Sequence, residues 1–262
     1  MNTTPRFSQS LVSFAGHDPL GGAGLVVDAK VFRSHDFTPF TVPTCLTVQD
    51  HKGVHDVSGV PTGFMTRAAR ALHGAVPPVG VKVGLVPSAG HINELCDILK
   101  ELSPRHVVCD PVLGSSGGQS LLPDSINTAF ARLFSLCSVI TPNLGEAMAL
   151  SGASTAEDAA AALLKNSPGL DAVVITGVPA PAESGYGDMV ALRDENPAII
   201  EAPAADRGRE IHGTGCHYSS ALLCALARGQ NPAAAVTTAQ RFLAETIAKG
   251  RIPLPGDMDM LP

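Results

Sequence analysis

The chain has 262 residues, of which 45% are apolar and 16% are charged, and its formal net charge is −6. A chain this apolar can bury a large core, which excludes an intrinsically disordered protein. No nucleic-acid partner is expected, because proteins that track phosphates need a surplus of Lys and Arg, and here 24 acidic residues face 18 basic ones.

Strand-like apolar runs alternate with stretches of helical spacing along the whole chain. In chain order, the expected elements are a strand at 10–15, a helix at 25–34, a strand at 40–46, a helix at 61–72, a strand at 79–83, a helix at 91–102, a strand at 106–109, a helix at 125–134, a strand at 138–140, helices at 144–150 and 156–164, a strand at 172–176, an antiparallel strand pair at 189–193 and 198–200, and helices at 216–228 and 233–248. This alternation predicts a single α/β domain over 1–262, with a mainly parallel central sheet and helices on both faces in three layers. The loop-like stretch 179–187 is either a mobile flap or an ordinary hairpin connection.

Neither a membrane segment nor a zinc site is expected. No apolar run reaches membrane-spanning length, and residues 1–9 are polar and lack the apolar core of a secretory signal. The six cysteines form no CxxC pair, and nothing in their spacing demands an oxidising compartment. We therefore expect a cytoplasmic protein without a membrane partner.

Polar and glycine-rich motifs follow four of the expected strands. They are Gly16-His17-Asp18, Asp110-Pro111, Thr141-Pro142-Asn143 and Thr176-Gly177. Open parallel sheets bind ligands beyond the carboxyl ends of their strands, so this shared placement predicts a ligand site at that edge.

The motif Gly213-Thr214-Gly215-Cys216 stands at the start of an expected helix. Glycines let several backbone N–H groups point at one spot, and the helix N-terminus adds partial positive charge, so the motif suits a phosphoryl group in transfer. The pKa of a thiol at this position tends to fall. Taken alone, the motif is also consistent with a plain glycine turn that begins a helix.

Two further motifs offer carboxylates. Asn143 and Glu146 lie one helical turn apart and suit Mg²⁺, which prefers oxygen ligands, although the same pair is also typical of a helix capping box. Asp110 precedes Pro111 and the glycine/serine run 114–118, and it suits a metal or a phosphate, or alternatively a simple turn before proline.

The glycine-rich run 21–24, with Asp28 in the helix behind it, permits close approach of a flat ligand to the backbone. Asp28 is expected to accept a hydrogen bond from that ligand, or else to be an exposed aspartate after a tight turn. Gln49 has both a donor and an acceptor, which suits a pyrimidine edge, but it also fits a surface position. His51 and His55 fall in an expected loop, where a metal role is not favoured.

These motifs occur together and in a distinctive order. GGAG at 21–24, VKVGL at 81–85, DPV at 110–112, TPN with Glu146, and GTGC at 213–216 together resemble the hydroxymethylpyrimidine/phosphomethylpyrimidine kinases of the ribokinase superfamily, from Ser13 to about Lys249. The resemblance implies a ribokinase-like fold, a homodimer, ATP and Mg²⁺. It also implies phosphorylation of 4-amino-5-hydroxymethyl-2-methylpyrimidine and then of its monophosphate in thiamin synthesis.

The resemblance also implies roles for individual positions. Matches to the pyrimidine pocket are Gly16, Ala23, Asp28, Gln49 and Val112; matches to the metal and phosphate positions are Asp110 and Glu146; matches on the nucleotide side are Asn143, Thr176 and Gly177; and matches to the catalytic anion hole are Gly213, Thr214, Gly215 and Cys216.

Three positions depart from the pattern of the family. Thr176 stands where the family often has a lysine near the ATP phosphates, Leu85 stands where methionine is common, and His217 stands where threonine is usual. His217 is one candidate to replace the lysine, although a histidine on a helix face is more often structural. The departures leave room for an enzyme that adds one phosphate, for a pyridoxal kinase, or for a non-catalytic pyrimidine-binding protein. A sugar kinase is less favoured, because Cys216 stands where those enzymes carry an aspartate.

Overall fold

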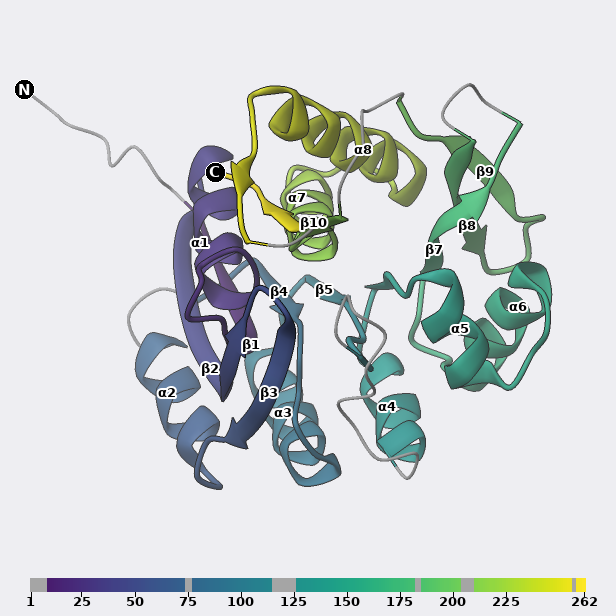
Figure 1. Ribbon diagram of the computed structural model, residues 1–262. Helices are drawn as coiled ribbons and strands as arrows, with labels where there is room; N and C mark the ends of the chain where they lie inside the picture. Colours follow the sequence, from purple (N-terminus) through teal and green to yellow (C-terminus); the bar gives the residue numbers. More distant parts are fainter. Residues whose placement is uncertain (1–8, 74–76, 115–125, 182–184, 204–209, 256–257) are drawn as a thin grey trace, which may run out of the picture.

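A nine-stranded sheet runs through the molecule in the order β3-β2-β1-β4-β5-β6-β7-β8-β9 (Figure 1). The computed structural model describes residues 9–73, 77–114, 126–181, 185–203, 210–255 and 258–262. The strands are β1 Ser10–His17, β2 Thr38–Asp50, β3 Gly53–Gly59, β4 Gly80–Val83, β5 His106–Cys109, β6 Val139–Ile140, β7 Ala172–Pro179, β8 Tyr186–Leu192 and β9 Ala198–Glu201. Strands β1, β2 and β4 to β7 are parallel, while β3, β8 and β9 join the two edges antiparallel.

Helices cover both faces of this sheet, as the alternating pattern predicts (Figure 1). One face packs against α2 Phe64–His73, α3 Ala89–Leu102, α4 Asn127–Phe134, α5 Leu144–Ser151 and α6 Ala156–Asn166, and the other packs against α1 Gly24–Ser34, α7 Thr214–Ala227 and α8 Pro232–Ala248. Each layer buries its own apolar cluster against the sheet. With few aromatic residues to use, both clusters consist mainly of Val, Leu, Ile and Ala side chains.

The structure differs from the prediction in the segment that follows residue 46, where a loop was expected. Strand β2 continues to Asp50 and pairs with β3, so His55 lies in a strand rather than in a loop. Its ring nitrogen lies 3.0 Å from an Asp50 carboxylate oxygen on the exposed hairpin. At the other edge, the N–H of Ala180 donates to the carbonyl of Gly185, which is the pattern of a β7–β8 hairpin connection; residues 182–184 of the expected loop lie outside the described residues.

A second, three-stranded sheet was not expected. Strand β10 Glu210–His212 pairs with β12 Met258–Met260, and β12 pairs with β11 Ile252–Pro253. The predicted helices at 216–228 and 233–248 are present as α7 and α8, but the three short strands around them were not predicted. Strands of two or three residues are too short to produce an alternating pattern that sequence reasoning can detect.

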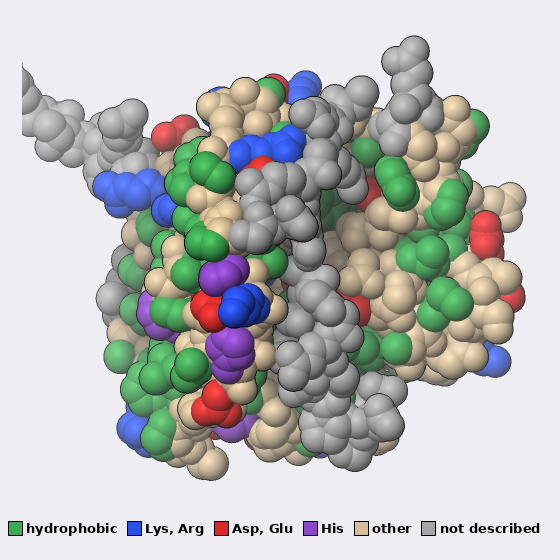
Figure 2. Space-filling model, viewed as in Figure 1, with side chains coloured by type: hydrophobic (Ala, Val, Ile, Leu, Met, Phe, Trp, Pro, Cys, Tyr) green, Lys and Arg blue, Asp and Glu red, His purple; other side chains and the backbone are tan. Residues whose placement is uncertain are grey.

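No helix in the described part of the chain has the length and apolarity that a membrane crossing requires. On the face shown in Figure 2, Lys and Arg side chains are scattered and form no broad basic patch, in agreement with the negative net charge.

Candidate active site

A cavity of about 1030 Å³ lies at the carboxyl ends of the parallel strands. Because the parallel strands end at the cavity, their order in the sheet determines which residues lie next to one another along its wall. Gly16, Gln49 and Leu85 come from β1, β2 and the end of β4 at one end, and Thr176 and Asp188 come from β7 and β8 at the other. The residues after β5 and the start of α7 lie between the two ends, since α7 packs against β4 and β5. The cavity therefore has two ends that meet at the start of α7.

The start of α7 touches the glycine-rich turn 21–24. Gly213 is the N-cap residue and has a φ of 82°, a conformation that favours glycine. A Cβ atom on Gly213 would overlap with the carbonyl oxygen of Gly22, so the two chain segments meet at backbone distance. The first N–H groups of a helix have no partner within the helix, and here they border the cavity as the anion-hole interpretation requires.

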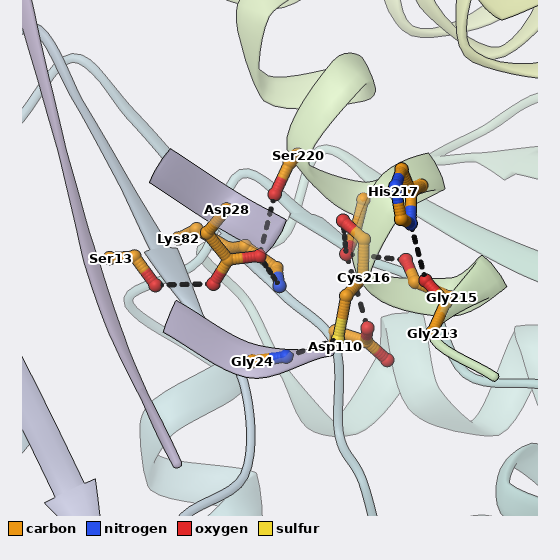
Figure 3. A network of polar contacts seen from close by, with 11 residues as sticks. Ser13, Gly24, Asp28, Lys82, Asp110, Gly213, Gly215, Cys216, His217 and Ser220 are labelled. Carbon is orange, nitrogen blue, oxygen red and sulfur yellow. Dashed lines mark hydrogen bonds and ion pairs between the residues drawn. The ribbon is translucent and has the colours of Figure 1, made fainter. Parts of the chain in front are cut away.

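Cys216 lies in the first turn of α7 and accepts a hydrogen bond from the N–H of Gly24 at 3.4 Å (Figure 3). Burial raises the pKa of the Cys216 thiol to about 11, and the nearby charge of Lys82 opposes this only in part. The expected fall of the pKa at a helix start is therefore not found, because desolvation of the thiolate outweighs the helix terminus and the lysine. At neutral pH the thiol is protonated and can donate a hydrogen bond.

Asp110 follows β5, and its carboxylate lies next to Gly215 of the anion hole. Its carboxylate accepts a hydrogen bond from the hydroxyl of Ser219 at 3.1 Å and would lie 3.5 Å from a Cβ atom on Gly215. Burial raises the pKa of Asp110, and the charge of Lys82 pulls it in the opposite direction. A carboxylate is thus held directly beside the site where phosphoryl oxygens would bind.

Glu146 forms a helix capping box with Asn143, which is one of the two interpretations that the sequence allowed. Asn143 accepts from the N–H of Glu146 at 2.9 Å, and the Glu146 carboxylate accepts from the N–H of Asn143 at 2.9 Å and of Leu113 at 3.3 Å. The same carboxylate lines the cavity, so the structural and functional interpretations are compatible. Burial, followed by the charge of Asp110, raises the pKa of Glu146 to about 7.

The groups near Asp110 and Glu146 fit a Mg²⁺ ion. Both offer carboxylate oxygens, and the Thr141 hydroxyl, which is buried beside the cavity, has no hydrogen-bond partner among the described residues. The described residues contain no cluster of three or more His, Cys, Asp or Glu side chains that would enclose a metal. Two carboxylates with room for water match Mg²⁺, which keeps part of its hydration shell.

Asp28 does not belong to the cavity wall, which corrects the expectation that it binds a ligand directly. Its side chain is fully buried and accepts hydrogen bonds from Ser13 at 2.5 Å and Ser220 at 2.8 Å, and it pairs with the ammonium group of Lys82 at 2.5 Å (Figure 3). Burial alone would lower the pKa of Lys82, but the charges of Asp28, Cys216 and Asp110 raise it above its ordinary range. Asp28 therefore ties α1 to β4 and α7 beneath the site.

The remaining expected pyrimidine-pocket residues all line the cavity. Gly16 and Gln49 lie at the β1–β2 end, whereas Ala23, beside Gly213, and Val112, after β5, lie nearer its middle. The turn that carries Ala23 is fixed by Asp18, whose carboxylate accepts from the N–H groups of Leu20, Gly22 and Ala23 at 2.8 to 3.0 Å. The ring of His212 lies 3.0 Å from the same carboxylate.

Asn143, Thr176 and Gly177 line the opposite end of the cavity. Asp188 fixes this end, because it accepts from the N–H of Gly177 at 3.1 Å and from the side-chain amide of Gln240 at 2.9 Å. Apolar residues of β10, α8 and β12 also line the cavity, namely Ile211, Leu243, Ala244, Ile247 and Met258. An apolar wall beside polar groups, which we call the nucleotide slot, is a suitable environment for a nucleotide base.

His217 does not replace the family lysine. It is 2% exposed, its Nδ1 atom lies 2.9 Å from the carbonyl oxygen of Gly213, and it is absent from the cavity wall. Lys52 on the β2–β3 turn is the sole Lys or Arg among the described residues that line the cavity.

Asp18 and Thr141 belong to motifs that the sequence placed at strand ends, although it gave neither residue a role of its own. Two other residues of the site, Lys82 and Gln240, were not singled out from the sequence. Lys82 lies inside an apolar strand and Gln240 inside a long helix, and nothing in the local pattern separates them from ordinary positions. The residues 115–118 of the glycine/serine run lie outside the described part of the chain.

The chain is similar along most of its length to proteins of thiamin synthesis. A family model described as phosphomethylpyrimidine kinase matches residues 18–256. A hydroxymethylpyrimidine/phosphomethylpyrimidine kinase of Rhizobium meliloti is 31% identical, with 90% of each chain covered. A thiamine biosynthesis bifunctional protein of Geobacter sulfurreducens is also 31% identical over 94% of this chain, but the chain spans about half of that protein, 51%.

Solved structures confirm the predicted ribokinase-like α/β fold. The ADP complex of Bacillus subtilis pyridoxal kinase has a TM-score of 0.84 at 28% identity, and the match covers 97% of this chain and 96% of that one. The phosphomethylpyrimidine kinase of Clostridium difficile has a TM-score of 0.77 at 27% identity, and the match covers 91% of this chain and 99% of that one.

Proposed function

This chain belongs to the phosphomethylpyrimidine kinase family, and from that membership we propose that it transfers the γ-phosphoryl group of ATP to 4-amino-5-hydroxymethyl-2-methylpyrimidine, to its monophosphate, or to both. The observation that carries the proposal is the place of Gly213–Cys216 between the two ends of the cavity. The alcohol approaches from the end that contains Gln49, and the nucleotide approaches from the end that contains Gly177.

With the hydroxymethylpyrimidine as acceptor, the hydroxymethyl oxygen forms a bond to the γ-phosphorus, the bond from that phosphorus to the bridging oxygen of ADP breaks, and the hydroxyl proton is released to solvent. With the monophosphate as acceptor, an oxygen of its phosphate group forms the new bond in place of the hydroxymethyl oxygen. The enzyme contributes mainly position and charge stabilisation, as is general for phosphoryl transfer. The N–H groups at the start of α7 would bind the equatorial oxygens of the transferring group. Gly215 and Gly213 allow those oxygens to come close to the backbone.

Mg²⁺ is part of the proposal. Asp110 and Glu146 would hold it, with Thr141 as a neighbouring oxygen donor, and the ion would supply neutralisation of phosphate charge. This contribution is important here, because Thr176 offers no positive charge at the nucleotide end.

For Cys216 we propose a role in orienting the alcohol. With a pKa of about 11 the thiol keeps its proton at neutral pH, so it can donate a hydrogen bond but does not act as a ready base. A Cys216→Ser variant, which preserves a donor, should then retain more activity than Cys216→Ala. Equal and full turnover of both variants would rule out a role in the reaction.

A pyridoxal kinase activity is the second candidate, and the similarity to the Bacillus subtilis pyridoxal kinase structure favours it. The deciding experiment is steady-state ATP turnover with the hydroxymethylpyrimidine, its monophosphate and pyridoxal, each with Mg²⁺ and with EDTA as the control. Turnover of either pyrimidine supports the thiamin assignment, and a preference for pyridoxal moves the enzyme to vitamin B6 salvage. Tight pyrimidine binding without turnover would indicate a non-catalytic binding protein.

We further propose a cytoplasmic homodimer. The support is an apolar strip on β2, where Leu46 and Val48 are 53% and 59% exposed two residues apart beside the edge strand β3. A second copy of the chain would cover this strip. Light scattering of the wild type and of a Leu46→Glu/Val48→Glu variant tests the proposal, and an unchanged mass would contradict it.

A further inference from the structure

The end of the chain folds back onto the segment that leads into the anion hole. Strand β12 runs parallel to β10, with Ile211 opposite Asp259 and His212 opposite Met260. In the part of the chain that the structure describes, β12 is the only strand that pairs with β10. Because β10 continues directly into Gly213, the C-terminal strand holds the entry to the anion hole in place (Figure 1).

Met260 also reaches the glycine-rich turn on the other side of the site. A Cβ atom on Gly22 would lie 2.6 Å from the sulfur of Met260 and 2.9 Å from the ring of His212. Met260 therefore fills the space that Gly22 leaves free, and its side chain packs where the turn, β10 and the C-terminal strand meet. The carbonyl of the same Gly22 lies against Gly213, so a shift of the turn 21–24 would also displace Gly213 in the anion hole.

The C-terminal strand is fixed to the rest of the molecule by buried contacts. Leu261 is 1% exposed and packs with Ile211 and Ile247 in a small apolar cluster. Arg251 lies 3.6 Å from the carboxylate of Asp259, whose side chain is 8% exposed. The strand is therefore held firmly enough to position other groups.

Met258, two residues before Met260, lines the cavity together with Ile211 and with Leu243 and Ile247 of α8, the helix whose Gln240 bonds Asp188 at the nucleotide end. Residues in the same strand two positions apart point to the same face of a sheet, so both half-buried methionines lie on one face of β12, Met258 at the cavity and Met260 at Gly22. One strand thus contacts the two features between which the phosphoryl group would move, the slot for the nucleotide and the turn 21–24.

We propose that the C-terminal strand is a working part of the active site. Met260 is a positioning residue that holds the turn 21–24 in place against the anion hole. Met258 forms part of the wall of the nucleotide slot. The kinetic part of this inference rests on the proposed kinase function, whereas the positioning of the two turns does not depend on which alcohol is the substrate.

The test compares Met260→Ser with Met260→Leu and with Ile252→Ser. Ile252 is opposite Met260 in the β11–β12 pair but is 43% exposed, so its variant controls for a general weakening of the strand. Because displacement of reacting groups by about 1 Å can cost up to about a hundredfold in rate, we expect Met260→Ser to lower kcat by at least about tenfold. Met260→Leu conserves volume and should stay within about threefold of the wild type, as should Ile252→Ser.

Met258→Ser should give a different kinetic signature. It removes apolar wall from the nucleotide slot without touching Gly22, so we expect a rise in KM for ATP of about fivefold, with kcat changed less. A tail that only stabilises the fold would lower the melting temperature of both serine variants and leave both kinetic constants near those of the wild type. That result would overturn the proposal.

Hydrogen exchange separates this inference from the proposed function. In Met260→Ser, backbone amides of 20–24 and 213–216 should exchange at least about tenfold faster than in the wild type, while those of the central strands do not change. If the wild type phosphorylates none of the alcohols, the proposed function fails, but this exchange result still decides the positioning role. Unchanged exchange in both turns would refute it.

Discussion

The ammonium nitrogen of Lys82 lies 2.5 Å from a carboxylate oxygen of Asp28, and neither side chain is exposed to solvent. Ser13 and Ser220 donate to the same carboxylate, so four segments of the chain meet at one buried charge pair. Burial of two charges is costly, and the pair offsets that cost only while both partners are present. The pair lies beside Cys216 and Asp110, close enough to shift the pKa of both, and neither partner lines the cavity (Figure 3).

Removal of one partner of this pair should be more harmful than removal of both. We expect Lys82→Met to lower the free energy of unfolding by about 3–5 kcal/mol, because it leaves Asp28 buried and unpaired. The double variant Lys82→Met/Asp28→Leu should recover a large part of that loss, and urea unfolding at pH 7 measures both. If Asp28 instead bound the substrate, the double variant would lose affinity for the alcohol; we expect its KM to stay near that of the wild type.

The Cys216 thiol should react slowly at neutral pH. With a pKa of about 11, its thiolate is scarce at pH 7.5, and alkylation by iodoacetamide should be about three hundredfold slower than for a free cysteine with its pKa near 8.5. The rate should rise steadily up to about pH 11. The Cys216→Ala variant controls for the other five cysteines, which are buried. Rapid labelling of Cys216 at pH 7 would show that the thiolate forms readily and would restore the idea of a base.

Glu146 should make the stability depend on pH in a defined direction. Its pKa rises from an ordinary 4.5 to about 7, so between these values the folded protein holds a proton that the unfolded chain has released. Stability from this group therefore falls as pH rises from about 4.5 to 7, by up to about 3 kcal/mol. Glu146→Gln should remove that slope in urea unfolding without Mg²⁺, whereas the exposed Glu157→Gln should not. Parallel slopes for Glu146→Gln and the wild type would contradict the raised pKa.

The sequence predicted which residues line the cavity because they come at or near the carboxyl ends of apolar strands. Asp110, Asn143 and Thr176 all reach the same sheet edge for that reason. The prediction for Asp28 was wrong because helix spacing does not reveal a buried lysine 54 residues away that takes up its charge. The β10–β12 sheet was missed since its short strands pair only through tertiary contacts.

Because Thr176 stands where the family often has a lysine, we predict that a lysine introduced there strengthens the binding of ATP. The described cavity wall contains Asp18, Asp50, Asp110, Glu146 and Asp188 but only one Lys or Arg, so an anionic nucleotide meets mostly negative charge. Thr176 lines the nucleotide end beside Gly177, where an added ammonium group would face the phosphates.

We expect Thr176→Lys to lower KM for ATP by about tenfold, which corresponds to about 1.4 kcal/mol, because it adds a charge-assisted contact at a site poor in cations. Thr176→Met has a similar length without charge and is the matched control, which should leave KM unchanged or raise it slightly. The gain should shrink as ionic strength rises, since screening weakens the added charge. Equal KM values for the two variants at low salt would mean that the phosphates do not approach position 176. The nucleotide would then have to lie further toward α8, and the assignment of Asn143, Thr176 and Gly177 to its binding would be withdrawn.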